Sequence, residues 1–139
     1  MDGKVFFDTT ILLYLYAADK PKKQATSIKV VQECKVKPTI STQTLSELAN
    51  TLARNMQLQW YMIEQVLTEI EQAFTVELIT VPMIHKATSI AESYHYSYYN
   101  SIAVATALLS GCTVFLSEQL EHEQLIDDQL HIRNPFLAS

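Results

Sequence analysis

Acidic and amide side chains fall at positions where predicted strands end or near the starts of predicted helices. In an open parallel sheet, ligands bind at the edge formed by the carboxyl ends of the strands. Carboxylate and amide oxygens gathered at that edge suit a hard divalent cation such as Mg²⁺, which can orient water for attack on a phosphodiester. The candidate residues are Asp8, Glu47, Asn100, Glu118 and Gln119.

Each candidate also has an ordinary structural interpretation. Asp8 and Asn100 are suitable N-caps for the helices predicted at these positions. Glu47 and Glu118 are acceptable as solvated acids on a helix and in a loop. The combination at one sheet edge, more than any single member, favours a functional site.

The elements that would position these residues alternate between strands and helices. Apolar runs predict strands, and apolar residues at spacings of three and four predict the helices between them. This order is typical of an α/β fold with a mainly parallel central sheet flanked by helices on both faces. Strands are predicted within residues 4–8, 35–42, 75–81, 112–117 and 130–136, and helices over 9–19, from 21, and over 42–55, 59–73, 82–94 and 100–110.

Proline and glycine mark several of these boundaries. Pro21 and Pro82 are expected in the first turns of helices, and Gly111 is expected just after the end of one. Pro38 indicates either a strand start or an edge strand, because proline donates no backbone hydrogen bond. The chain has only 2 glycines, which excludes GxGxxG and P-loop nucleotide sites.

Composition is that of an ordinary globular protein. The 139 residues are 48% hydrophobic and 18% charged, which predicts one domain over residues 1–139 with a sizeable core. No apolar run approaches the length of a membrane span, and the N-terminus lacks the pattern of an export signal. We therefore expect a cytoplasmic protein without membrane association. Cys34 and Cys112 lack metal-binding spacing and are predicted to be buried free thiols.

Charge is unevenly distributed along the chain. The net charge of -5 argues against a general nucleic-acid binder, but six of the 10 basic residues lie between positions 20 and 37. A lysine-rich segment beside an acidic cleft could contact phosphates while the cleft holds a metal ion. A solvated helix face explains the same lysines, and from charge alone it is the simpler interpretation.

Four tyrosines precede or begin the helix predicted from Asn100. Packing at a helix junction is the simpler interpretation, and a base-stacking platform is the alternative. The four histidines are scattered without metal-binding spacing, and Ser117 lacks the GxSxG context of a serine hydrolase. The tyrosines are Tyr94, Tyr96, Tyr98 and Tyr99.

Four segments in order carry a family resemblance over nearly the whole chain. They are "VFFDTTILLYLY", "ISTQTLSELANTL", "YSYYNSIAVATALLSGCTVFLSEQL" and "IRNPF". On these segments the sequence resembles the PIN-domain family, in particular the VapC-like ribonuclease toxins of bacterial toxin–antitoxin pairs. The resemblance implies a PIN-like three-layer sandwich and an endoribonuclease that uses Mg²⁺ or Mn²⁺ and cleaves single-stranded regions of RNA. It also implies a cognate antitoxin-like protein partner and a homodimer.

The resemblance assigns roles by position. Asp8 and Glu47 match the first two members of the family's acidic quartet, whereas Asn100 and Gln119 stand where the third and fourth are normally aspartate. Asparagine and glutamine keep an oxygen ligand but carry no charge. The metal ligands implied are Asp8, Glu47, Asn100 and Gln119, the catalytic residues are Asp8, Glu47, Asn100 and Glu118, and the substrate contacts are Thr9, Lys22 and Lys23.

Two functions remain open from the sequence. The chain could be a weakened nuclease in which Glu118 restores a lost charge, or an inactive PIN-fold module that binds RNA or an antitoxin-like protein. Asn100 could also be an engineered replacement of aspartate. A receiver-like signalling domain is disfavoured, because the sequence lacks the adjacent early acids and the lysine after the last strand that such domains carry.

Overall fold

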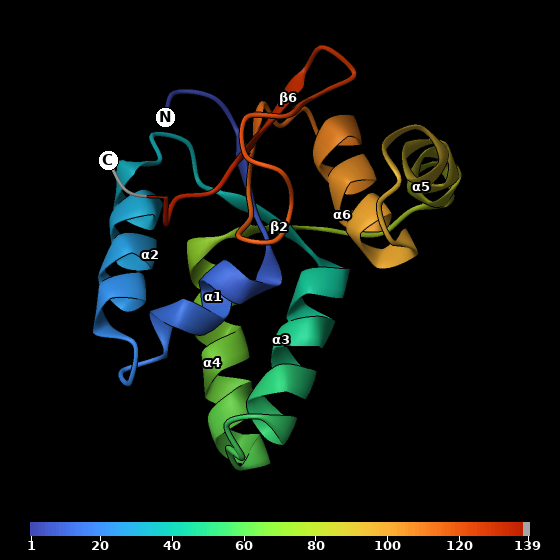
Figure 1. Ribbon diagram of the computed structural model, residues 1–139. Coiled ribbons are helices and arrows are strands. Elements are labelled where there is room, and N and C mark those ends of the chain that lie inside the picture. The colour runs from blue at the N-terminus through green and yellow to red at the C-terminus, as the bar shows by residue number, and fades with distance from the viewer. Residues whose placement is uncertain (138–139) are drawn as a thin grey trace.

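The computed structural model describes residues 1–137 and contains a six-stranded sheet with the strand order β3-β2-β1-β4-β6-β5. Neighbouring strands are parallel except β5 and β6, which pair antiparallel. The strands are β1 (Val5–Phe7), β2 (Thr39–Ser41), β3 (Thr75–Glu77), β4 (Val114–Leu116), β5 (Leu125–Ile126) and β6 (Leu130–Arg133). The helices are α1 (Thr9–Leu15), α2 (Pro21–Glu33), α3 (Thr42–Arg54), α4 (Trp60–Ala73), α5 (Val81–Tyr94) and α6 (Tyr98–Leu109) (Figure 1).

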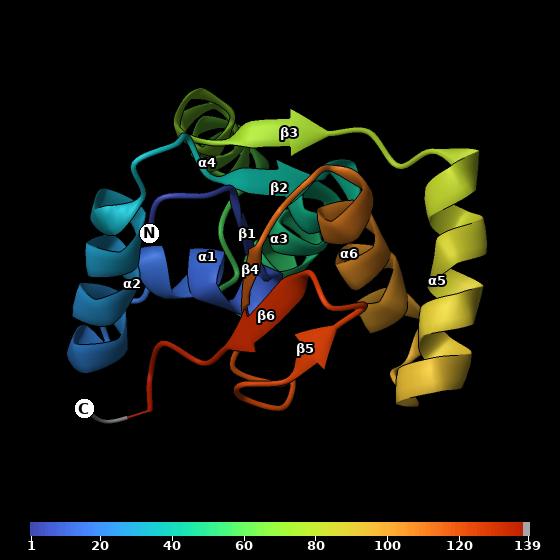
Figure 2. The ribbon, with the colours of Figure 1, turned by 90° about the horizontal axis from the view of Figure 1, so that it is seen from above.

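Alternating side chains of the central strand build one apolar core on each face of the sheet. Val5 and Phe7 of β1 pack with residues of α1 to α4, whereas Phe6 packs with α5 and α6. Phe6 stacks on Phe115 of β4, with ring centroids 5.1 Å apart. Figure 2 shows α1 and α2 on one side of the sheet and α5 and α6 on the other. The predicted α/β sandwich with a mainly parallel sheet is confirmed.

The register of the strands brings their carboxyl ends to a common edge. Phe7 of β1 pairs with Leu116 of β4, and the backbone N–H of Asp8 donates to the carbonyl oxygen of Leu116 at 3.0 Å. Ser41 ends β2 beside β1 and is also the N-cap of α3, where its hydroxyl accepts from the N–H of Thr44. Side chains that follow β1, β2 and β4 therefore converge at one edge of the sheet.

The predicted proline and glycine boundaries agree with the structure. Pro21 and Pro82 lie in the first turns of α2 and α5. Gly111 follows the C-cap residue of α6 with φ 80°, a conformation that glycine adopts most readily. Pro38 directly precedes β2, which pairs with both β1 and β3, so it marks a strand start and the edge alternative is wrong.

Two helices differ from the predicted bounds. α1 ends at Leu15 and does not continue to Asp19, because the N–H of Tyr16 bonds back to the carbonyl of Leu13 and a turn leads into α2. α6 begins earlier than predicted. Its N-cap is Ser97, whose hydroxyl accepts from the backbone N–H of Asn100 at 3.2 Å, so Asn100 lies in the first turn and is not the cap.

The hairpin of β5 and β6 was predicted only in its second strand. β5 has two residues, which is too short for a periodic pattern to indicate. The turn between the strands contains Asp127 and Asp128, both with positive φ. Lys86 of α5 donates to the Asp127 carboxylate at 2.6 Å, which ties this hairpin to α5.

The two cysteines are free thiols, as predicted. Cys112 is buried, and burial raises the pKa of its thiol to about 11, so it is inert at neutral pH. Cys34 is only half-buried, which corrects the prediction for that residue. Within residues 1–137, no helix is long and apolar enough to cross a membrane.

Candidate active site at the edge of the parallel sheet

Asp8 is fixed by the two elements that meet at its position. It directly follows β1 and caps α1, and its Oδ1 accepts a hydrogen bond from the N–H of Thr9 at 2.8 Å. The hydroxyl of Ser117, just after β4, donates to Oδ2 of Asp8 at 3.0 Å. Ser117 is fully buried and also accepts from the N–H groups of Gln119 and Leu120. The loop after β4 is therefore anchored to Asp8.

The environment of Asp8 disfavours its negative charge. Burial raises the pKa of this carboxyl, the hydrogen bonds from Thr9 and Ser117 partly oppose the shift, and the nearby charge of Glu47 adds to it. Two carboxylates close enough to affect one another favour a proton or a cation between them. This is the electrostatic condition for a cation site.

Glu47 lies on α3, opposite α1 and the start of α6. Thr9 donates its hydroxyl to Oε1 of Glu47 at 2.7 Å. Gln43, one turn earlier on α3, donates to Oε2 of Glu47 at 3.4 Å and to the backbone carbonyl of Tyr99 at 3.2 Å. These contacts connect α1, α3 and α6 around one hollow.

The hollow is a pocket of about 300 Å³ that contains both carboxylates. Four predicted metal ligands meet there, since Asn100 and Gln119 line it together with Asp8 and Glu47. The sequence did not single out Asn50 for the site, and it offered Tyr99 only within the alternative of a base-stacking platform. Asn50 is three residues after Glu47, a spacing that places both on one helix face. The lining residues are Asp8, Thr9, Thr10, Leu13, Glu47, Asn50, Thr51, Tyr99, Asn100, Ala103 and Gln119.

Glu118 does not line this pocket, contrary to the expectation that it replaces a missing carboxylate there. Its carboxylate accepts from the hydroxyl of Tyr14 at 2.6 Å and forms an ion pair with Lys23. Burial raises the pKa of Glu118, but the hydrogen bonds from Lys23 and Tyr14 outweigh burial and lower it below its ordinary value. The structure therefore holds Glu118 as a charged partner of Lys23.

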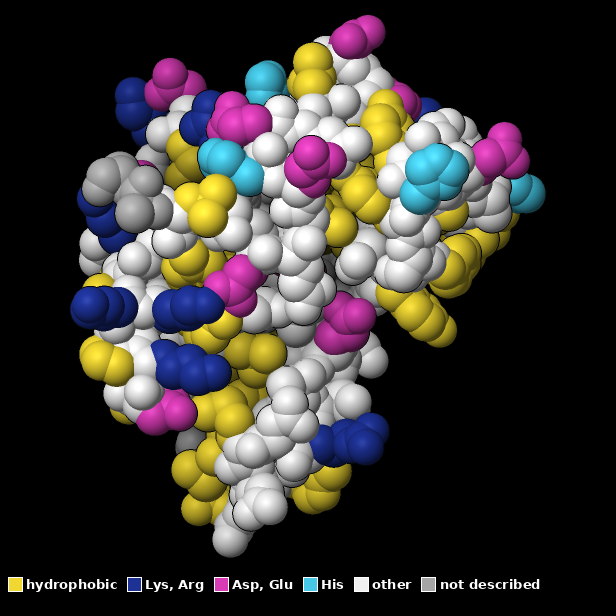
Figure 3. Space-filling view, in the orientation of Figure 1, with side chains coloured by type: hydrophobic (Ala, Val, Ile, Leu, Met, Phe, Trp, Pro, Cys, Tyr) yellow, Lys and Arg dark blue, Asp and Glu magenta, His cyan; other side chains and the backbone are white. Residues whose placement is uncertain are grey.

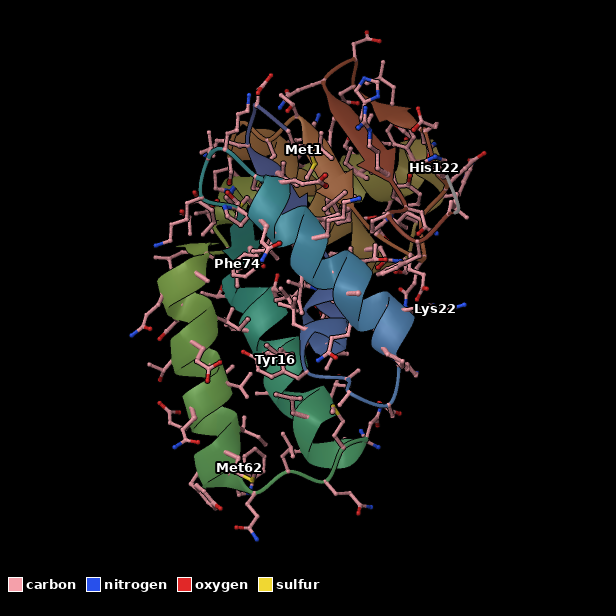
Figure 4. The ribbon with its side chains drawn as sticks, turned by 90° about the vertical axis from the view of Figure 1, so that its left-hand side faces the viewer. Met1, Tyr16, Lys22, Met62, Phe74 and His122 are labelled. Carbon is pink, nitrogen blue, oxygen red and sulfur yellow. The ribbon has the colours of Figure 1, made fainter. Side chains whose placement is uncertain are left out.

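The lysines predicted to contact phosphates have different environments. The ammonium group of Lys23 pairs with Glu118 and lies 4.9 Å from the ring centroid of Tyr14 and 5.2 Å from that of Phe136. Lys22 is exposed and projects away from α2 in Figure 4. Figure 3 shows basic side chains gathered over the N-terminal half of α2 with acidic side chains beside them. Lys22 is therefore open to a ligand, whereas Lys23 is partly exposed but would have to leave Glu118 to contact a phosphate.

The side chains of the pocket have the ligand atoms that a divalent cation needs, but they carry few negative charges. Asp8 and Glu47 supply carboxylate oxygens, and Asn100 and Gln119 can add neutral ones, which are ligand types that Mg²⁺ and Mn²⁺ accept. In the part of the chain that the structure describes, no group of three or more His, Cys, Asp or Glu side chains is placed to hold a metal ion. Two carboxylates are thus available where three or four would bind more tightly.

This fold and its pocket define an α/β protein with two paired carboxylates at the carboxyl edge of a parallel sheet. The family model of the PIN domain matches residues 5–124, so the chain belongs to the PIN domain family. A search of curated protein sequences finds no match.

Solved structures similar to this chain include three toxins or toxin complexes of bacteria. A toxin–antitoxin complex from Klebsiella pneumoniae has a TM-score of 0.74 at 17% identity and covers 95% of this chain and 98% of that chain. VapBC-1 from nontypeable Haemophilus influenzae has a TM-score of 0.70 at 16% identity, with the same coverage of 95% and 98%. VapC20 of Mycobacterium tuberculosis, described as a Sarcin-Ricin loop cleaving toxin, has a TM-score of 0.65 at 16% identity and covers 80% of this chain and 86% of that chain. At these identities the likeness shows the fold.

Proposed function

We propose that this PIN-domain protein is a toxin-type, metal-dependent endoribonuclease that cleaves single-stranded regions of RNA in the cytoplasm. The observation that carries the proposal is the meeting of Asp8 and Glu47 in one pocket at the carboxyl edge of the sheet. The description of the structurally similar VapC20 as a Sarcin-Ricin loop cleaving toxin supports RNA as the substrate.

Asp8 and Glu47 would hold Mg²⁺ or Mn²⁺, with Asn100 and Gln119 as neutral ligands. The bound ion would supply a polarised phosphodiester and an activated water molecule. Thr9 and Ser117 keep the two carboxylates in place through the hydrogen bonds to Glu47 and Asp8. If each missing carboxylate costs about 1.4 kcal/mol, the two amides together weaken metal affinity roughly a hundredfold.

A protein partner is the second part of the proposal. The toxin–antitoxin complexes among the similar structures support a cognate antitoxin-like protein, and we also propose that the chain forms a homodimer. A hollow of about 310 Å³ between α2 and α4 offers apolar side chains to a partner, including the exposed Ile28 and the half-buried Val31. Figure 4 shows Tyr16 and Phe74, which also line it, between these two helices.

A non-catalytic module is the second candidate function. It is favoured by the two amides in the pocket and by the ion pair that holds Glu118 with Lys23. Such a module would keep the PIN fold to bind RNA or an antitoxin-like protein. Native mass measurement after co-expression with a candidate antitoxin, together with a test for Mn²⁺ binding, separates the two functions.

Cleavage of a mixed-sequence single-stranded RNA in Mn²⁺ and in Mg²⁺ tests the nuclease directly. The parent chain is compared with Asp8→Ala and Asn100→Asp. Cleavage by the parent that is lost in Asp8→Ala supports the proposal. Cleavage by Asn100→Asp alone identifies a nuclease silenced by one missing charge and favours the binding module. Cleavage by Asp8→Ala at the parent's rate contradicts the site.

A further inference from the structure

The pocket around Asp8 is richer in neutral hydrogen-bonding groups than in charge. Three amide side chains and three threonines line it against two carboxylates. Among the described residues, no lysine, arginine or histidine lines it. A phosphate group in this pocket would face two negative charges and no cation, so without a metal ion the pocket suits a neutral ligand. The amides are Asn50, Asn100 and Gln119, and the threonines are Thr9, Thr10 and Thr51.

The amides are available to a ligand, whereas the carboxylates are partly engaged. Asp8 and Glu47 accept hydrogen bonds from Thr9, Ser117 and Gln43. The hydrogen bonds that Asn100 and Gln119 make within the described residues use their backbone N–H groups. Their side chains can therefore donate and accept toward the pocket, while the carboxylates retain lone pairs that accept amino groups.

Tyr99 adds an aromatic surface to the pocket. The residue is 65% exposed, and its backbone is held by the hydrogen bond from Gln43 to its carbonyl oxygen. Tyr94 and Tyr96 instead stack on one another with ring centroids 6.0 Å apart. The junction-packing interpretation thus fits Tyr94 and Tyr96. The ring of Tyr99 packs edge to face with that of Tyr98, with centroids 5.4 Å apart, and its exposed part offers a stacking surface beside hydrogen-bonding side chains.

We propose that this pocket binds the base of one unpaired RNA nucleotide without a metal ion, by stacking on Tyr99 and by hydrogen bonds to Asn100 and the neighbouring polar side chains. The ligand rests on the second candidate function, the module that binds RNA, because a base hydrogen-bonded to Asn100 and the carboxylates occupies the position proposed for the metal ion. Unpaired bases are bound in this way, on aromatic rings and through their polar edges. A volume of about 300 Å³ is at the small end of ligand pockets and suits one nucleoside.

The surroundings give the rest of the strand a path. An adjoining hollow shares Thr10, Leu13 and Thr51 with the pocket and is also lined by Lys20 and Asp19. A base in the pocket can therefore keep its neighbouring phosphate near a lysine and away from Asp8 and Glu47. The two carboxylates accept from exocyclic amino groups, so the pocket prefers cytosine to uracil.

Fluorescence anisotropy with labelled RNA hexamers in EDTA tests the base site. The first hexamer has a single cytidine, and its other five sugars lack a base. The second hexamer has uridine in place of that cytidine, and the third has no base at any position. We expect the cytidine strand to bind most tightly and the fully abasic strand most weakly. Tyr99→Ala should weaken binding of the cytidine strand roughly 5- to 150-fold and leave the abasic strand unchanged.

Tyr61→Ala is the matched control. Tyr61 is 63% exposed on α4 and does not line the pocket, so its removal should not change binding. Asn100→Asp should weaken binding of the cytidine strand in EDTA, because it replaces a donor by a third negative charge. Equal binding of the cytidine and abasic strands, or binding only after Mn²⁺ is added, would overturn the proposal. RNA cleavage in Mn²⁺ is a separate measurement, so the base site and the nuclease can fail independently.

Discussion

Asp8 combines a structural role with an unfavourable charge. Its carboxylate caps α1 and accepts the hydroxyl of Ser117, yet burial and the charge of Glu47 raise its pKa above the ordinary value of 3.8. When the folded pKa exceeds the unfolded one, the folded state binds the proton more tightly. This stabilisation is complete below the unfolded pKa and is lost as pH rises through the folded pKa.

Asp8→Asn should therefore change the pH dependence of stability. Asparagine does not titrate, so the free energy of unfolding of the variant relative to the parent should increase from about pH 4 toward neutral pH. The lost hydrogen bond from Ser117 shifts the difference by a constant and cancels from the slope. Urea unfolding at several pH values measures it, with the exposed Asp19→Asn as control. If the difference in free energy of unfolding between variant and parent does not change with pH, the pKa of Asp8 is not raised in the folded state.

The residues of the pocket could be predicted to a large extent from the sequence. Asp8, Asn100 and Gln119 are near the end of a strand or the start of a helix, and the parallel sheet brings such positions to one edge. Glu118 was placed wrongly in the pocket, because the direction of a loop side chain depends on its partners. Those partners, Tyr14 and Lys23, come from elements about a hundred residues away in sequence, and no local pattern indicates them.

At the scale of elements, the pairing of Lys23 with Glu118 joins α2 to the loop after β4. The Lys23 side chain is 40% exposed and that of Glu118 24%, so solvent screens much of the attraction. Lys23→Met should destabilise the fold by about 0.5 to 1 kcal/mol at pH 7. Because the pKa of Glu118 is lowered in the parent, this difference should shrink as pH falls through that pKa.

Lys22→Met is the control for this pair, since Lys22 is exposed on the adjacent position of α2. It should leave the midpoint of urea unfolding unchanged. An equal effect of both substitutions would mean that the net charge of α2, and not the contact with Glu118, stabilises the fold.

The end of α6 depends on a backbone conformation that the sequence already indicated. Gly111 has φ 80°, and a Cβ added there would meet no heavy atom within 4 Å. Gly111→Ala should therefore cost about 1 to 2 kcal/mol through backbone strain alone, without a steric clash. Thermal unfolding measures the loss, and Gly111→Asn should recover part of it because asparagine tolerates the left-handed region better. Full stability of the alanine variant would contradict this assignment.

Other boundaries of the fold were less predictable, for physical reasons that differ between elements. The apolar pattern of α1 continues past Leu15 because the following residues Tyr16 and Ala17 are also packed in the core region, although their backbone turns. β5 exists through pairing with β6 rather than through a pattern of its own. Hydrophobic periodicity records burial, and it indicates an element's end only where a cap or a proline coincides with it.

For the whole molecule, the balance of charge in the pocket couples metal binding to folding. A ligand that binds only the folded state adds RT ln(1 + [L]/Kd) to the free energy of unfolding. Asn100→Asp adds a negative charge beside Asp8 and Glu47, which repel one another already. The same charge should lower the Kd for Mn²⁺ about tenfold if it contributes about 1.4 kcal/mol.

The relative stability of parent and Asn100→Asp should therefore reverse with the metal. In EDTA the variant should unfold at a lower temperature than the parent. In excess Mn²⁺ the free energy of unfolding of the variant should increase by about 1.4 kcal/mol more than that of the parent, so the variant should then unfold at the higher temperature. Asp8→Ala should gain little in Mn²⁺, because it lacks a ligand. Absence of any Mn²⁺ effect on both parent and Asn100→Asp would remove the metal site from the proposal. The chain would then use its PIN fold to bind RNA or an antitoxin-like protein. Asp8 and Glu47 would act only as hydrogen-bond acceptors in the pocket.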